Sequence, residues 1–426
     1  MEILLSGLLL LLLAFLGTPL FVIIAVIALL AFWASGIDTS AVIVEMFRLG
    51  STPTLIAIPL FTFAGYMLAE SNTPKRVVQL FQALFGWMPG GLAIVALVAC
   101  AAFTAFTGAS GVTIIALGGL LYPILIQEQY PERFSLGLVT TSGSLGLLFP
   151  PSLPIILYGV VAGQSIDQLF VAGLVPGLML VALLSLYSVR KGITAGVPRT
   201  AFSAARVWRA VRGAVWEIPL PFLIIGGIYG GIITATEAAA LTAFYVLIVE
   251  VFIYRDLKLF RDVPRIMRES MVLVGGILII LATALGLTNY LIDEQVPMQI
   301  LDFIRESMDS RLLFLILLNI FLLIVGMMMD IFSATIVVVP LIVPIAQSFG
   351  IHPVHLGIIF LMNLEIGYLT PPVGLNLFIS SFRFRKPVSN VYRSTLPYIG
   401  ILLIALLIIT YVPELSLWLV ELFGVR

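Results

Sequence analysis

Apolar runs of bilayer-spanning length dominate this chain and limit it to a membrane fold. They lie at 4–34, 54–69, 270–288, 312–329 and 396–412. The composition agrees, since 61% of the residues are hydrophobic, 10% are charged and the mean hydropathy is +1.17, whereas soluble domains carry about 25% charged residues. The alternating pattern of a β-barrel is absent. The sequence therefore predicts an all-α polytopic membrane protein.

Several local features argue against enzymes and signal peptides. Residues 1–36 lack a basic start and a small-residue cleavage site, so they do not resemble a signal peptide. Cys100 is the single cysteine, and His352 and His355 are predicted to lie in a solvated loop rather than in a metal site. "GASG" at 108–111 lacks the Lys-Ser/Thr of a P-loop. We expect no enzymatic activity and no organic cofactor.

Basic and acidic stretches give the orientation in the membrane. By the positive-inside rule, the stretches rich in Lys and Arg are cytoplasmic, and the acidic segment 293–309 lies outside. We therefore expect a multi-pass protein of a bacterial or archaeal inner (cytoplasmic) membrane. The basic stretches are 75–76, 190–212, 255–268 and 383–393.

The orientation implies that one apolar segment enters the membrane and returns. Residues 75–76 and the loop 127–133 are both assigned to the cytoplasm, and small, helix-breaking residues "TGASG" at 107–111 lie midway between them. A re-entrant helical hairpin satisfies this constraint. Irregular backbone at membrane depth is tolerated only where protein buries it or where it lines a cavity.

Two proline pairs interrupt apolar segments that otherwise favour helices. Proline removes a backbone donor and clashes with the preceding turn, so a straight buried helix does not carry two in succession. When the chain is overlaid on itself with a shift of 221 residues, both pairs coincide without a gap from about residue 52 to 381. We interpret this register as two structural repeats. The coinciding residues are Pro123 with Pro344, Gly146 with Gly367, and Pro150-Pro151 with Pro371-Pro372.

The two repeats are predicted to face opposite ways. Residues 75–76 are cytoplasmic, whereas the matching residues 296–297 belong to the outer acidic segment. Inverted repeats with broken helices are typical of secondary transporters, whose binding sites lie near the bilayer midplane. Proline kinks also serve packing alone. The duplication of break and hairpin favours a binding site in which freed carbonyls and helix ends contact an ion or an anion.

The motifs of the chain resemble those of a known family. The sequence is similar to the large membrane subunit, of the DctM type, of tripartite ATP-independent periplasmic (TRAP) transporters, and the matching pieces follow the expected order over most of the chain. They are "GASGVTIIALGGLLYPIL" (108–125), "GSLGLLFPPSLPIILYG" (143–159), "GGIYGGIITATEAAALTAFYVL" (226–247), "GMMMDIFSATIVVVPLIVPIA" (326–346) and "MNLEIGYLTPPVGLNLF" (362–378).

The resemblance implies an elevator-type transporter with separate transport and scaffold domains. Sodium influx would drive uptake of a carboxylate-bearing solute, which a periplasmic substrate-binding protein delivers. A small four-helix membrane subunit would brace the scaffold, as a separate chain because nothing precedes the first span here. Membrane lipids are expected partners, and nucleic acid is not.

The resemblance also divides the chain. Scaffold helices and an outer arm are expected at 1–50, and further scaffold helices with cytoplasmic arms at 166–271. The first repeat core covers 51–165, with its hairpin at about 88–126 and its broken helix at about 134–160. The second core covers 272–386, with its hairpin at about 311–347 and its broken helix at about 355–380, and a C-terminal scaffold helix follows at 387–426.

On this resemblance, sodium is the only metal expected, at two sites formed by a hairpin tip and a break. The same hydroxyl and carbonyl groups also suit a hydrogen-bonded helix tip without an ion. The first set is Thr107, Ser110, Gly111, Ser142, Gly146 and Pro150. The second set is Gly326, Asp330, Ser333, Asn363, Gly367, Thr370 and Pro371.

Ionisable residues at membrane depth are costly and point to function. Asp330 is expected to ligate sodium or to cap a helix. Glu365 is a candidate ion ligand, coupling acid or structural partner, whereas Glu237 in "TATEAAA" is expected to cap its helix. No Lys or Arg lies at either break, so hydroxyls, amides and helix N-termini would hold the solute. The candidates for solute binding are Ser144, Ser152, Thr370 and Asn376.

Two other functions remain open at this point. A receptor-independent sodium/dicarboxylate or citrate-type symporter has a similar architecture and needs no partner subunit. A passive channel predicts continuous conductance rather than saturable, ion-coupled flux. The sequence leaves the solute open among C4-dicarboxylates, sialic acid and other sugar or keto acids.

Overall fold

The computed structural model describes residues 16–50, 52–197, 201–230, 232–296, 298–299 and 310–424. The regular elements of these residues are helices, with no strand in the described ranges. Seven of their helices are long and apolar enough to cross a membrane, or up to eight if one bent pair is counted as a span. The prediction of an all-α polytopic chain is confirmed. Residues 4–15 of the first apolar run, and residues 297 and 300–309 of the outer acidic segment, lie outside the described residues.

The first half of the chain contains a helical hairpin followed by an interrupted helix. Gly108, with φ +63°, ends the first hairpin helix, because a left-handed backbone favours glycine. The interrupted helix bends by 43° at its break. The elements are α2 (Leu20–Ala34), α3 (Ser40–Gly50), η1 (Pro53–Ile56), α4 (Ala57–Glu70), α5 (Thr73–Phe85), α6 (Gly91–Thr107), α7 (Ser110–Thr113), η2 (Ile114–Gly118), α8 (Gly119–Gln127), α9 (Glu132–Ser142), η3 (Leu145–Leu148) and α10 (Leu153–Ala162).

The middle of the chain forms long apolar helices joined by basic segments. A capping box starts one of them, since the Thr234 hydroxyl accepts from the Glu237 N–H and the Glu237 carboxylate accepts from the Thr234 N–H. The predicted capping role of Glu237 is confirmed. The elements are α11 (Ile166–Thr194), α12 (Ala204–Gly213), α13 (Pro219–Tyr229), α14 (Ala235–Ile248), η4 (Val249–Ile253) and α15 (Asp262–Asp293).

The second half again contains a hairpin followed by an interrupted helix. Only two residues separate the two hairpin helices α17 and α18, and the segment 368–374 separates the two halves of the interrupted helix. The elements are α17 (Arg311–Met328), α18 (Ile331–Ser348), α19 (Pro353–Gly367), α20 (Leu375–Phe384), α21 (Val388–Tyr411) and α22 (Glu414–Phe423).

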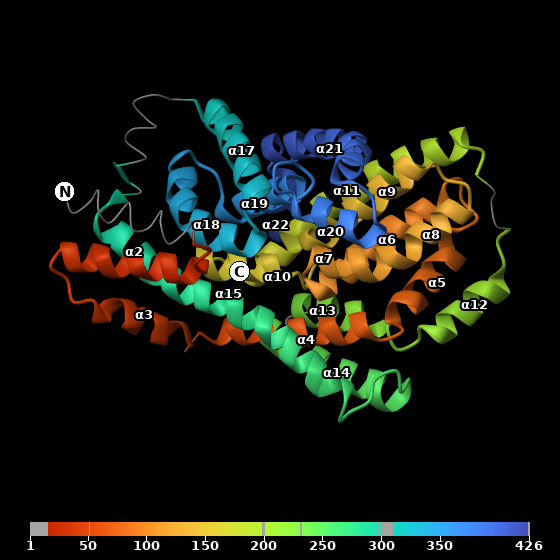
Figure 1. Cartoon of the computed structure of the whole chain (residues 1–426), viewed down its shortest axis with the longest axis horizontal. Coiled ribbons are helices and arrows are strands. Elements are labelled where there is room, and N and C mark those ends of the chain that lie inside the picture. Colours follow the sequence, from red (N-terminus) through yellow and green to blue (C-terminus); the bar gives the residue numbers. More distant parts are fainter. Residues whose placement is uncertain are drawn as a thin grey trace.

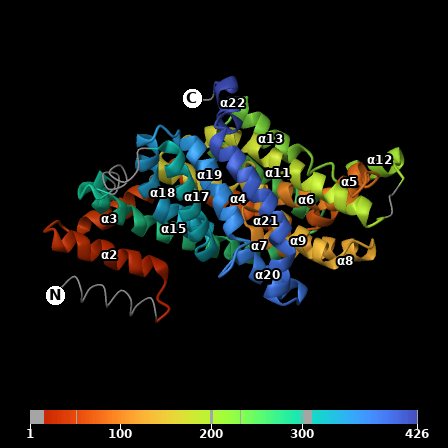
Figure 2. The same cartoon turned by 90° about the horizontal axis from the view of Figure 1, so that it is seen from above.

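The molecule is elongated. Helices α10, α19 and α20 of the two interrupted helices lie near its middle, and α9 lies toward the end that carries α8 (Figures 1 and 2). Helices α2 and α3 lie at one end, and α5, α8 and α12 lie at the other. Helix α15 packs against α2, α3 and α4, and α4 packs against α14. Helix α17 packs against α19, and α6 packs against η3, so each hairpin contacts the interrupted helix that follows it.

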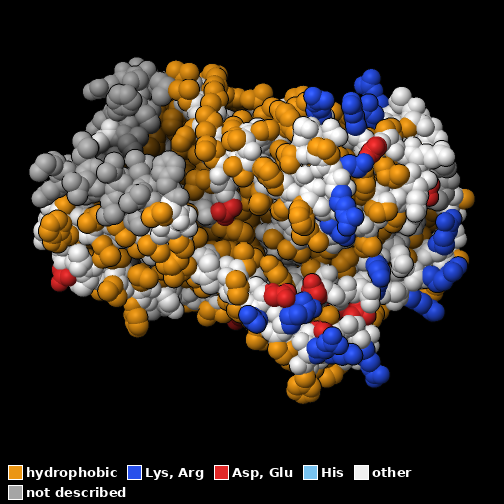
Figure 3. Space-filling view, viewed as in Figure 1, with side chains coloured by type: hydrophobic (Ala, Val, Ile, Leu, Met, Phe, Trp, Pro, Cys, Tyr) orange, Lys and Arg blue, Asp and Glu red, His pale blue; other side chains and the backbone are white. Residues whose placement is uncertain are grey.

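Charge is distributed unevenly over the surface in Figure 3. Apolar side chains cover much of the face shown, whereas Lys and Arg side chains gather on the side of α12 and along the lower edge. The basic side chains of α12 are Arg206, Arg209 and Arg212, and this helix contributes no residue to the core. Its position agrees with a basic arm at the membrane surface.

A cluster of buried charges, here called the Arg76 cluster, fixes the turn between α4 and α5. The Arg76 guanidinium forms ion pairs with Glu217, with Glu250 (3.1 Å) and with Asp256 (2.7 Å). It also lies 3.8 Å from the ring centroid of Tyr254. Burial opposes the charged form, but the three carboxylates outweigh it and raise the pKa of Arg76. The cluster therefore ties the α4–α5 turn to the ends of α13 and η4.

Candidate functional site

Both interrupted helices break at their proline pairs. The first stops at Leu148 and resumes at Leu153, and the second stops at Gly367 and resumes at Leu375. The Pro150-Pro151 and Pro371-Pro372 bonds are both cis. Each break leaves helix C-terminal carbonyls and helix N-terminal N–H groups inside the molecule. These groups are the polar backbone that an apolar helix normally conceals.

Glycines let each break approach the hairpin before it. A Cβ atom on Gly146 would lie 2.3 Å from the Ala101 carbonyl oxygen and 2.5 Å from the Ala105 nitrogen. A Cβ atom on Gly367 would lie 2.3 Å from the Gly326 carbonyl carbon. Only glycine fits such contacts. Ala105 and Gly326 are related by the same shift of 221 residues as Gly146 and Gly367, so equivalent positions make equivalent contacts.

The tip of the first hairpin contacts both breaks. The Thr104 hydroxyl lies 2.9 Å from the Gly143 carbonyl oxygen and 2.7 Å from Thr113 Oγ1. The Ser110 hydroxyl donates to Asn376 Oδ1 over 2.7 Å, across 266 residues of sequence. The first hairpin tip is therefore joined to α20, the second half of the other interrupted helix.

Two other predicted residues of the first sodium set lie at the same place. The Thr107 hydroxyl lies 3.5 Å from the Ala109 carbonyl oxygen, and Gly111 lies against the Ile379 side chain. The Ser142 hydroxyl donates to the Val139 carbonyl over 3.4 Å within its own helix. The structure thus brings the tip residues close to Gly143, and Ser142 lies one position before it.

At the second hairpin tip, Asp330 caps helix α18. Its Oδ1 atom accepts from the backbone N–H groups of Phe332 (2.9 Å) and Ser333 (3.0 Å), and the Ser333 hydroxyl donates to Oδ2. A hydrogen bond also joins this tip to the break, because the Tyr368 hydroxyl accepts from the Ile331 N–H over 2.7 Å. The carboxylate therefore has the capping role, and ligation of sodium by Asp330 stays a prediction.

The second predicted sodium set separates into parts. Gly326, Asn363 and Gly367 lie together where α17 crosses α19. Asn363 donates to Asn319 Oδ1 over 2.7 Å, whereas the Thr370 hydroxyl donates to the Ile366 carbonyl over 2.9 Å. Asp330 and Ser333 bond to each other at the hairpin tip. The three groups surround the end of α19 rather than sharing hydrogen bonds.

Buried polar atoms without hydrogen-bond partners concentrate at the two breaks. Glu365 is 1% exposed, and neither of its carboxylate oxygens has a partner. Its polar neighbour is Ser144, whose hydroxyl donates to the Thr141 carbonyl over 3.2 Å. Ser144 and Glu365 are related by the shift of 221 residues. The unpartnered atoms at the breaks are Thr141 Oγ1, Ser152 Oγ, Asn363 Oδ1, Glu365 Oε1 and Oε2, Asn376 Nδ2 and Ser380 Oγ.

These atoms define what the site can bind. Most of them are oxygen atoms, which suit a hard monovalent cation, and each unpartnered buried group costs about 1–3 kcal/mol until a ligand satisfies it. Arg383, the basic residue of α20, lies about two turns beyond Asn376 and donates to the Ile115 carbonyl over 3.0 Å. An anion at the breaks would therefore rely on helix N-termini, hydroxyls and amides.

The structure adds residues that the sequence did not single out. Thr104 and Thr113 connect the first hairpin to Gly143, and Asn319 joins Asn363 to Thr410. Thr104 lies one helical turn before Thr107, so its spacing was a usable signal. Asn319 was a rare amide in an apolar helix. Thr141 and Ser380 showed no such signal.

Comparison with known proteins identifies similar chains. The family model described as "Tripartite ATP-independent periplasmic transporter, DctM component" matches residues 6–415. A C4-dicarboxylate TRAP transporter large permease protein of Pseudomonas aeruginosa is 37% identical over 375 residues, covering 88% of each chain. An ectoine TRAP transporter large permease protein of Halomonas elongata is 30% identical over 413 residues, covering 96% of each.

A solved structure supports the fold. The YdaH transporter of Alcanivorax borkumensis superposes with a TM-score of 0.60 and covers 91% of this chain and 88% of that one. The sequence identity is 12%, so the likeness concerns the fold alone.

Proposed function

Because this chain belongs to the DctM family of TRAP transporter large permeases, and is not an enzyme, we propose that it imports a carboxylate-bearing solute driven by sodium influx. Import occurs through an elevator movement, in which the two hairpins and the two interrupted helices move against the remaining scaffold helices. We propose that the transport and scaffold domains have the boundaries predicted from the sequence. Sodium ions are the coupling substrate.

The unpartnered oxygen atoms at both breaks are the observation that carries this proposal. They lie on the two interrupted helices, and each break contacts the preceding hairpin through Gly146 or Gly367, which are the repeat-equivalent glycines. A membrane protein that only needed anchoring would gain nothing from unsatisfied polar groups at membrane depth. Bound sodium would satisfy these oxygens and supply positive charge to the site.

The proposed position of the solute depends on the sodium ions. Since the breaks carry no Lys or Arg, we infer that the carboxylate binds beside the sodium ions, with Ser144, Ser152, Thr370 and Asn376 as hydrogen-bonding partners. Ser152 and Asn376 each have a buried atom free for this purpose. Two of the relatives are named for C4-dicarboxylate and for ectoine, and both of these solute types contain a carboxylate. We propose a C4-dicarboxylate, a sialic acid, or a similar sugar or keto acid.

The partners follow from the family. We propose that a periplasmic substrate-binding protein delivers the solute and that a small four-helix membrane subunit braces the scaffold, in the inner membrane of a bacterium. The relatives are named as permease components of tripartite transporters, which supports this assembly.

Uptake into proteoliposomes tests the proposal. Vesicles with this chain and its small partner receive labelled C4-dicarboxylate, with and without purified binding protein and an inward sodium gradient. Uptake that needs both the binding protein and the sodium gradient supports the hypothesis of a tripartite transporter. Uptake with sodium but without binding protein identifies a receptor-independent symporter, and flux that is neither saturable nor sodium-dependent identifies a channel.

A further inference from the structure

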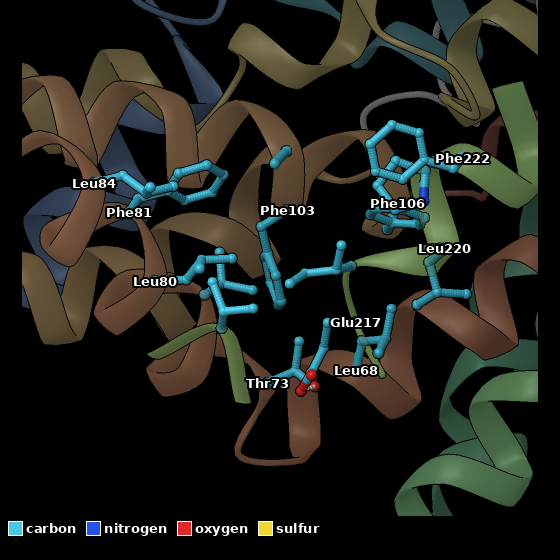
Figure 4. A pocket seen from close by; sticks show the side chains of 15 residues that line it. Leu68, Thr73, Leu80, Phe81, Leu84, Phe103, Phe106, Glu217, Leu220 and Phe222 are labelled. Carbon is cyan, nitrogen blue, oxygen red and sulfur yellow. Dashed lines mark hydrogen bonds between the residues drawn. The ribbon is translucent and has the colours of Figure 1, made fainter. Parts of the chain in front are cut away.

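An apolar cavity of about 410 Å³ separates the first hairpin from the scaffold at the basic end of the molecule. Figure 4 shows Leu80, Phe81 and Leu84 of α5 on one side, Leu220 and Phe222 of α13 on the opposite side, and Phe103 of α6 between them. The volume falls within the range of about 300–1,000 Å³ typical of small-molecule sites. The cavity therefore has room for an apolar chain.

The polar end of this cavity carries no free charge. Thr73 and Glu217 lie together there (Figure 4). Glu217 is paired with Arg76, and its other oxygen accepts from the Tyr254 hydroxyl over 2.8 Å. The remaining lining is apolar, so the cavity itself selects a hydrocarbon and no polar solute.

The mouth of the cavity lies among exposed apolar and aromatic side chains. Phe222 is 72% exposed and Leu84 36% exposed. Trp208 on α12 and Trp216 in the segment after it are exposed as well, and Val211 between them lines the cavity. Tryptophans of this kind favour the boundary between bilayer and water. The exposed side chains beside the cavity therefore suit the boundary between bilayer and water.

Helix α12 supplies positive charge beside this mouth. Arg206, Arg209 and Arg212 follow one another at intervals of three residues and so share one side of the helix, next to the side that carries Trp208 and Val211. Within the described part of the chain, these guanidinium groups enter no salt bridge, although Arg212 stacks on Trp208 at 5.0 Å. A polar hollow of about 330 Å³ lies between α5 and α12. It is lined by Gln79, Gln82, Arg206 and Arg209.

We propose that this region binds an anionic phospholipid of the cytoplasmic leaflet, with an acyl chain in the cavity between α5, α6 and α13 and the phosphate headgroup at the arginines of α12. The apolar cavity and the basic stripe have the two chemistries of such a lipid, and the positive-inside rule places α12 on the cytoplasmic side. The proposal concerns lipid binding alone and does not depend on the transported solute.

Native mass spectrometry with defined lipids tests the proposal. The full-length protein, with its small partner, is exchanged into nanodiscs of equal parts phosphatidylglycerol and phosphatidylcholine, extracted, and analysed for retained lipid. We expect phosphatidylglycerol to be retained preferentially. The triple variant Arg206→Gln, Arg209→Gln, Arg212→Gln should reduce this preference on the order of tenfold or more, since cationic side chains near the membrane surface attract anionic headgroups.

Two further variants separate the headgroup from the chain. The matched control, Arg255→Gln with Arg261→Gln and Arg268→Gln, removes the same charge from the other cytoplasmic arm and should retain the preference. Ala102→Trp fills the cavity and should reduce retention of both lipids. Equal retention by the α12 variant and wild type overturns the headgroup assignment. Unchanged retention in Ala102→Trp, with a monodisperse protein, overturns the cavity assignment.

Discussion

Two regions of this protein differ in how completely their buried polar groups are paired. In the Arg76 cluster, the carboxylates of Glu217, Glu250 and Asp256 each contact a guanidinium nitrogen. At the breaks, both oxygens of Glu365 lack a partner, as does Oδ1 of Asn363. Since an unsatisfied buried group is costly, complete pairing indicates a structural role, and we propose that a ligand completes the pairing at the breaks.

The largest loss of stability is expected when the cation of the Arg76 cluster is removed. Arg76→Ala leaves three carboxylates, from the turn before α13, from η4 and from the loop after η4, buried together without a counter-charge. Breaking a buried ion pair in this way costs about 3–5 kcal/mol. We expect a clear fall in the thermal unfolding midpoint of the detergent-solubilised protein, with the sodium dependence of the remaining folded protein unchanged.

The control for this variant is Arg265→Ala. Arg265 pairs with Glu70 (2.8 Å), but both side chains are more than 40% exposed, and an exposed pair is worth about 0–1 kcal/mol. If Arg76→Ala and Arg265→Ala destabilise the protein equally, the structural role of the Arg76 cluster is wrong.

The unpaired region should respond to sodium itself. A ligand that binds only the folded state stabilises it by about 2.7 kcal/mol at 100 times its dissociation constant. We therefore expect sodium chloride to raise the unfolding midpoint above that in potassium chloride of equal ionic strength. Asn363→Leu, which removes an unpartnered oxygen at α19, should reduce the gain, and Arg76→Ala should keep it. An identical midpoint in both salts would contradict ion binding at the breaks.

The positions of the breaks were predictable from the sequence, but the pairing of side chains was not. Proline has a local effect on a helix, so both breaks and the glycines beside them followed from the repeat. The Asp330 cap was likewise local. Ser110 and Asn376 are 266 residues apart, and the Arg76 cluster joins segments more than 140 residues apart, so no spacing rule reveals either contact.

Glu365 sharpens the contrast because it is an acidic residue among the unpartnered groups at the breaks. If its carboxylate contacts a cation, Glu365→Gln removes the charge while keeping the shape. We then expect the sodium concentration for half-maximal uptake to rise on the order of tenfold, equivalent to about 1.4 kcal/mol. The measurement is initial uptake in proteoliposomes as a function of sodium concentration.

An exposed acid provides the matched control for this substitution. Glu132→Gln makes the same charge change at a residue that pairs with Lys386 on the surface. It should leave the sodium dependence unaltered. A Glu365→Gln protein with wild-type sodium dependence and raised thermal stability would assign Glu365 to the structure of the domain instead.

A smaller effect is expected where the two repeats touch. The hydrogen bond from Ser110 to Asn376 Oδ1 connects the first hairpin tip to α20, and an ordinary hydrogen bond contributes about 0.5–1.5 kcal/mol. We expect Ser110→Ala and Asn376→Ala each to lower stability, with a double variant less destabilised than the sum. Additive effects would show that the contact does not couple the two elements.

The smallest expected effect is on how the stability supplied by the Arg76 cluster changes at acid pH. Burial is the largest influence on Asp256 and raises its pKa, but hydrogen bonds from Asn72 and Arg76 outweigh burial together and bring the pKa below the usual 3.8. A depressed folded-state pKa stabilises the protein above the unfolded value, and this contribution is lost as the pH falls through the lower value. The free energy of unfolding, measured between about pH 5 and 3, should therefore fall less steeply in Asp256→Asn than in wild type. The difference should be under about 1 kcal/mol because the Asp256 carboxylate is partly solvated. Asp293→Asn, an exposed carboxylate at the end of α15, should keep the wild-type slope. Parallel acid profiles for wild type and Asp256→Asn would mean that the Arg76 cluster derives its stability from Glu217 and Glu250 alone.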